Sequence, residues 1–77
     1  MNNYRRKDIA NIIQQLEELK EQVTNVMSEE QEYLDNIPEN LQMSEKAENS
    51  QNAISELENA ECSIDEAISS LQTAMEW

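Results

Sequence analysis

The chain has 77 residues, with 17 acidic and 5 basic side chains, a net charge of −12, no glycine, no histidine and one cysteine. Without glycine, and without an alternation of apolar and polar residues of period two, the sequence lacks the signals of β-hairpins and β-sheets. A single cysteine excludes an internal disulfide framework, and no apolar run approaches the roughly 20 residues of a membrane span. We therefore expect one all-α domain covering residues 1–77.

The first predicted helix covers about residues 6–35, after a frayed start at residues 1–4. Apolar residues recur along it with the 3-4 spacing of a heptad seam. The seam residues are Ile9, Ile12, Leu16, Leu19, Val23, Val26, Tyr33 and Ile37. Ile13, Met27 and Leu34 lie beside this seam and widen it on one side, which is typical of a helix in a bundle.

A turn is predicted over residues 36–43. Pro38 disfavours helix at the residue before it, so the first helix should end by about Asn36. The residues from Pro38 to Leu41 can form a single turn of their own. Ser44 then suits an N-cap, because Glu45 and Glu48 follow at the positive end of the next helix.

The second predicted helix covers about residues 44–75 and repeats alanine every seven residues. The repeat consists of Ala53, Ala60, Ala67 and Ala74, with a branched aliphatic four residues after each of the first three: Leu57, Ile64 and Leu71. Seven residues make two helical turns, so these rows form one stripe. The alanines allow another helix to approach closely.

Two helices of similar length with a short connection predict an antiparallel helical hairpin. A chain of this size rarely supplies more than ~3–5 kcal/mol from a single core. We therefore expect the hairpins to assemble into a helical-bundle or coiled-coil homo-oligomer. The apolar positions expected to stay exposed in a monomer are Met27, Leu34, Ile54 and Ile68. Glu30 and Glu61 interrupt the seams, and either set the helix register or face an opening to solvent.

The first candidate site is the basic cluster Arg5, Arg6 and Lys7. In an antiparallel hairpin it lies beside the C-terminal end of the second helix, where carbonyl groups attract cations. Local charge balance is the simpler interpretation. The functional alternative is an anion site, in which several subunits combine their cations to bind a nucleotide signal.

The second candidate site is the turn, whose polar residues exceed the needs of a connector. Turn chemistry accounts for Asp35, Asn36 and Pro38. It does not account for Tyr33 and Asn40, and exposed polar groups on a loop favour recognition. The candidate partner-binding residues here are Tyr33, Asp35, Asn36, Glu39 and Asn40.

Catalysis is not expected. Cys62 has no imidazole to activate it, and its position points outward, so we interpret it as a surface thiol. No carboxylate lies in an apolar environment that the sequence identifies, and the di-iron bundle pattern requires histidine. We expect no cofactor and no metal.

The segment from Glu30 to Gln42 (EQEYLDNIPENLQ), with the Arg5–Lys7 cluster before it and the alanine-phased helix after it, resembles a family of small uncharacterised proteins. These are encoded by phages and prophages of Gram-positive bacteria. The resemblance implies a phage-type accessory protein in the bacterial cytoplasm, and it brings no known activity. By class-level analogy, such a protein binds and disables a host factor, including defence systems.

The leading hypothesis is thus a non-catalytic inhibitor of a host protein. The alternatives are an oligomeric sponge for an anionic nucleotide, an acidic DNA mimic, or a purely structural oligomer. A chain of this charge repels nucleic acid and anionic membranes, so direct binding to either is not expected.

Overall fold

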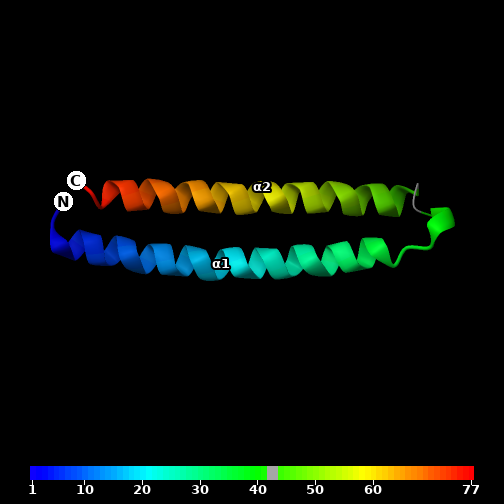
Figure 1. The fold of residues 1–77 in the computed structure, drawn as a ribbon, viewed down its shortest axis with the longest axis horizontal. Coiled ribbons are helices and arrows are strands. Elements are labelled where there is room, and N and C mark those ends of the chain that lie inside the picture. The colour runs from blue at the N-terminus through cyan, green and yellow to red at the C-terminus, as the bar shows by residue number, and fades with distance from the viewer. Residues whose placement is uncertain (42–43) are drawn as a thin grey trace.

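The computed structural model describes residues 1–41 and 44–77, and in these ranges the chain is a two-helix antiparallel hairpin (Figure 1). Helix α1 covers Asn3–Asp35, the short 3₁₀ helix η1 covers Glu39–Leu41, and α2 covers Glu45–Ala74. The Cα atoms extend over 59 × 15 × 11 Å. The two chain termini lie together at one end and the turn lies at the other. The predicted all-α hairpin is confirmed.

Short-range side-chain chemistry sets the helix ends. The Asn2 side chain accepts a hydrogen bond of 2.9 Å from the backbone N–H of Arg5, so α1 begins earlier than predicted. The expectation of a frayed start at residues 1–4 is wrong, because an asparagine cap satisfies a free donor of the first turn.

The turn follows the predicted order of signals. Helix α1 ends at Asp35, three residues before Pro38, and the Asn36 backbone N–H closes the last turn on the Glu32 carbonyl at 3.1 Å. The predicted single turn after Pro38 is η1. Ser44 caps α2, with Glu45 and Glu48 in its first turn. Gln42 and Met43, also expected in the connection, lie outside the described residues.

The best-buried part of the described core lies near the turn. Ala47 is fully buried, and Leu34 and Ile54 are each 9% exposed, with Met27 and Ile37 packed against them. Further from the turn, the apolar residues that face the opposite helix are only half-buried, among them Ile13, Leu16, Ile64 and Leu71. The core therefore tapers toward the termini.

The sequence assigned the wrong row of α1 to the hairpin interior. Met27, Leu34 and Ile54 were expected to stay exposed in a monomer, but they form or flank the core. The row expected inside is instead half exposed, at 45–51%: Ile12, Leu19, Val26 and Tyr33. The physical reason is that α1 turns the row of Arg6, Ile13, Lys20, Met27 and Leu34 toward α2, where its two cations find partners.

Hydrogen bonds between the helices fix their register. Ser50, a polar residue only 2% exposed, donates to the Glu30 carboxylate at 2.8 Å. The Thr24 hydroxyl donates to the Glu61 carboxylate. Both glutamates that interrupt the seams thus accept a hydroxyl from the opposite helix. This supports their interpretation as register-setting residues.

Within residues 1–41 and 44–77, neither helix contains a stretch long and apolar enough to cross a membrane.

Candidate functional site

An open apolar pocket of about 310 Å³ lies at the turn. We call it the turn-end pocket and define it by its lining residues: Tyr33, Asn36, Ile37, Pro38, Leu41, Ser44 and Lys46. The proline and the η1 turn carry the chain across the hairpin end, which brings the last residues of α1 beside the first turn of α2. This volume is at the lower end of the range for ligand pockets.

The sequence found the polar part of this region and missed its apolar part. Tyr33 and Asn36 both line the pocket, whereas Asp35, Glu39 and Asn40 are exposed outside its lining. Gln31 donates a hydrogen bond of 3.0 Å to Asp35, which holds that carboxylate along α1. The contribution of Leu41, which is 48% exposed, was missed. A leucine three residues after the proline of a predicted turn is the signal that could have identified it.

The three residues of the basic cluster have different surroundings. Arg6 is half-buried, and its Nε donates to the Met75 carbonyl, the cap of α2, at 2.9 Å. Its Nη1 also donates to the Asn3 side chain at 3.2 Å. Arg5 and Lys7 are exposed. The contact of Arg6 is the one that the helix-end interpretation predicts, since terminal carbonyls of a helix carry partial negative charge.

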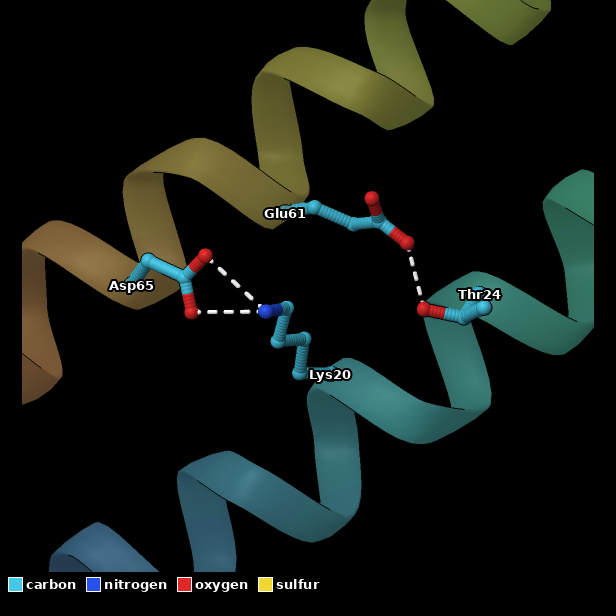
Figure 2. A network of polar contacts seen from close by, with 4 residues as sticks. All are labelled: Lys20, Thr24, Glu61 and Asp65. Carbon is cyan, nitrogen blue, oxygen red and sulfur yellow. Dashed lines mark hydrogen bonds and ion pairs between the residues drawn. The ribbon is translucent and has the colours of Figure 1, made fainter.

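A polar network joins the helices near their midpoints (Figure 2). The Lys20 ammonium lies 2.8 Å from one Asp65 carboxylate oxygen and 2.9 Å from the other. The hydrogen bond with Asp65 is the main reason that the pKa of Lys20 rises above its ordinary value of 10.5. The partner of Lys20 thus lies on α2. Because Lys20 is paired with Asp65 and Thr24 with Glu61, we assign these contacts to register rather than to chemistry.

No cluster of three or more potential metal ligands occurs in the described part of the chain. Cys62 is exposed on α2, as its heptad position predicts. The carboxylates at the hairpin interface, those of Glu30 and Glu61, are both bound by hydroxyl groups.

A second surface follows the long side of the hairpin. An open groove of about 440 Å³ lies between the helices and is lined by Leu19, Gln22, Val23, Val26, Leu57 and Ile64. Of the exposed α1 row, Leu19 and Val26 line this groove. On α2, Ala60 lies three residues after Leu57 and four before Ile64, so it shares their face.

We call this surface the lateral apolar face. It combines the exposed row of α1 with the alanine row of α2: Ile12, Leu19, Val26 and Tyr33, with Ala53, Ala60, Ala67 and Ala74. Thr24 lies two residues from Val26, about 200° around the helix, so the polar network occupies the other side of the hairpin.

Comparison of the chain with protein-family models, curated proteins and solved structures gave no match.

Proposed function

We propose that this chain is a non-catalytic phage-type accessory protein that binds a host protein in the bacterial cytoplasm and inhibits it by occupying it. The observation that carries the proposal is the turn-end pocket, an apolar hollow on a chain of net charge −12. The resemblance of residues 30–42 to the phage-encoded family supports the same region, since the pocket uses Tyr33, Asn36, Ile37, Pro38 and Leu41 from it.

The chemistry of the pocket defines the partner surface. Tyr33 and Leu41 are about half exposed, so they offer apolar area to an inserted side chain without first unfolding the turn. Aromatic residues in such positions often carry a large share of binding energy. Asp35 and Glu39 lie exposed beside the pocket and add to the acidic field. The fitting partner therefore presents an apolar anchor within a basic surface, which the acidic hairpin steers into contact.

The test compares a pocket variant with a matched surface variant. Tagged wild type, Leu41→Ser and Glu18→Gln are expressed in a Gram-positive host, and copurifying proteins are quantified by mass spectrometry. The recovered partner is then purified and its affinity measured by calorimetry. We expect Leu41→Ser to weaken binding at least ~10-fold, a loss of about 1.4 kcal/mol, while Glu18→Gln stays close to wild type.

Inhibition is tested on the purified partner, whose own activity should fall in proportion to the bound fraction. A partner that binds Leu41→Ser as tightly as wild type would place the interaction elsewhere on the hairpin. Absence of any enriched protein in the wild-type sample would contradict the proposal.

A further inference from the structure

The lateral apolar face is an apolar surface of the described residues that, apart from Tyr33, the proposed function does not use. Four large side chains recur every seven residues on it, each 45–51% exposed. Isolated exposed apolar residues are ordinary on protein surfaces, but a continuous row beside an apolar groove is typical of an interaction surface. The core at the described hairpin interior is thin away from the turn, so this row is the main apolar surface left to bury.

We propose that this face binds a second copy of the same chain, giving a four-helix dimer with a two-fold axis parallel to the long axis of the hairpin. In this arrangement α1 of each copy packs on α2 of the other, and both turns lie at the same end. The inference rests mainly on Ile12, Leu19 and Val26, which do not line the turn-end pocket.

The area of the face is sufficient for a stable dimer. The hairpin is 59 Å long. Each helix with its side chains is about 10 Å wide, so the two-helix face has an area on the order of 1,000 Å². A standard specific interface uses roughly 800 Å² from each partner.

The charge pattern permits a second copy despite the net charge of −12. None of the acidic residues lies in the α1 row or in the alanine row of the face. The positions four residues before the row residues are amides and hydroxyls at Gln15, Gln22, Asn49, Ser63 and Ser70, and carboxylates at Asp8, Glu29 and Glu56. An apolar centre with a polar, mostly uncharged rim is the usual anatomy of a protein interface.

The shapes of the two rows select the symmetry. The contact between Glu30 and Ser50 places Val26 opposite about residue 54, and the contact between Thr24 and Glu61 places it opposite about residue 59, so Val26 lies between the heights of Ala53 and Ala60. A two-fold axis along the hairpin keeps these heights, so each large residue meets the alanine row of the other copy. A perpendicular axis would set large residues against large ones and leave a gap between the alanines, which close packing disfavours.

The first test measures mass. Light scattering and sedimentation of the wild type should give twice 8.9 kDa at micromolar concentration. Val26→Glu should raise the dimer dissociation constant at least ~100-fold, because a charge would be buried without a partner. Asn25→Glu is the matched control, since it adds the same charge one residue away on the outer side of α1 and should leave the dimer intact.

Circular dichroism of each variant checks that the hairpin still folds. A folded wild-type monomer at these concentrations would overturn the proposal, as would equal effects of Val26→Glu and Asn25→Glu. A wild-type monomer that instead captures another protein through Val26 would also overturn it, since the occupant would then not be a second copy.

The second test reports symmetry and does not require a dissociating variant. Val26→Cys, Ala53→Cys and Ile12→Cys are each made with Cys62→Ser, so that every chain has one thiol. An oxidised mixture of the Val26→Cys and Ala53→Cys chains should form the mixed covalent dimer several-fold more than the Val26→Cys and Ile12→Cys mixture. The reverse preference would overturn the parallel axis, because a perpendicular axis through the middle of α1, at residue 19, brings positions 26 and 12 together.

Discussion

Single polar side chains between the helices decide how they align. Lys20 and Glu61 occupy interior heptad rows, yet each has its charged group engaged, Lys20 by Asp65 and Glu61 by Thr24. Because both pairs lie at the edge of the interface, their ends stay close to water and the cost of burying charge is small. A slip of one heptad would separate both pairs at once. Their main contribution is therefore to register rather than to overall stability.

The contribution of Lys20 should depend on pH in the alkaline range. Its pKa is raised in the folded protein by the hydrogen bond with Asp65, so the stability it adds is complete below its ordinary pKa of 10.5. That stability is lost as the pH rises through the folded-state pKa. We expect the melting temperature of wild type to exceed that of Lys20→Gln at pH 8, and the difference to shrink as the pH rises above 10.5. Lys7→Gln is the control, and an unchanged difference across the range would contradict the assignment.

Arg6 and Arg5 should differ although they are adjacent. Arg6→Gln removes the hydrogen bond to the Met75 carbonyl at the end of α2, and we expect it to lower the free energy of unfolding by ~0.3–1 kcal/mol. Arg5→Gln removes an exposed cation and should cost less than ~0.5 kcal/mol. Urea titrations of both variants measure this.

The same pair of variants tests the nucleotide-sponge hypothesis. A thermal shift with cyclic or linear nucleotides that Arg5→Gln abolishes would show that the cluster binds ligand, since binding raises the melting temperature by mass action. The absence of a shift at millimolar nucleotide would leave the helix-end role alone.

At the scale of helices, local sequence signals were sufficient to predict where each helix begins and ends. They were not sufficient to predict which face of α1 packs against α2. Pro38, Ser44 and the heptad spacing act within a few residues, so the turn, the cap and the two helices could be predicted from sequence. The facing of α1 depends on a choice between two rows that share Ile9, Leu16 and Val23. Sequence favours the more apolar row, whereas the hairpin buries the row with Arg6 and Lys20, whose partners come from α2.

At the turn-end pocket, too, only part of the lining could be predicted from the sequence. Tyr33 and Asn36 could be predicted because they exceed what turn chemistry needs. Lys46 belongs to the next helix, and its place in the lining follows from how the chain crosses the hairpin end. Sequence distance alone could not supply that contact.

Replacement of two alanines of α2 by leucine should change the stability of the hairpin by very different amounts. Ala47 is fully buried against the core near the turn, so Ala47→Leu should lower the free energy of unfolding by ~1–3 kcal/mol through overpacking. Ala53 is exposed, so Ala53→Leu should change the stability of the single hairpin by less than ~0.5 kcal/mol. Denaturation in a dimer-dissociating Val26→Glu background measures both. Equal losses would show that the alanine row is already packed within one chain.

For the whole molecule, the distribution of charge separates two kinds of surface. Most acidic residues occupy the outer positions of both helices, Glu30 and Glu61 lie between the helices, and none lies in the two rows of the lateral apolar face. Long-range repulsion between two copies of charge −12 therefore opposes association without placing a charge in the contact. Attraction to a basic partner arises from the same field with the opposite sign.

Added salt should consequently separate self-association from DNA mimicry. Raising the salt from about 0.02 M to about 0.5 M shortens the screening length from roughly 20 Å to about 4 Å. Screening removes the repulsion between hairpins, so the dimer dissociation constant should fall several-fold in sedimentation equilibrium. A partner bound through a phosphate-like acidic surface should instead lose affinity by orders of magnitude over this range, because its binding is electrostatic. A partner anchored in the turn-end pocket should associate more slowly in high salt but keep most of its affinity, since the apolar contact remains.

Charge-neutral variants of outer carboxylates, such as Glu18→Gln with Glu66→Gln, should tighten the dimer at low salt and have little effect at high salt. A dimer that weakens as salt rises would mean that complementary charges hold it, which contradicts an apolar interface.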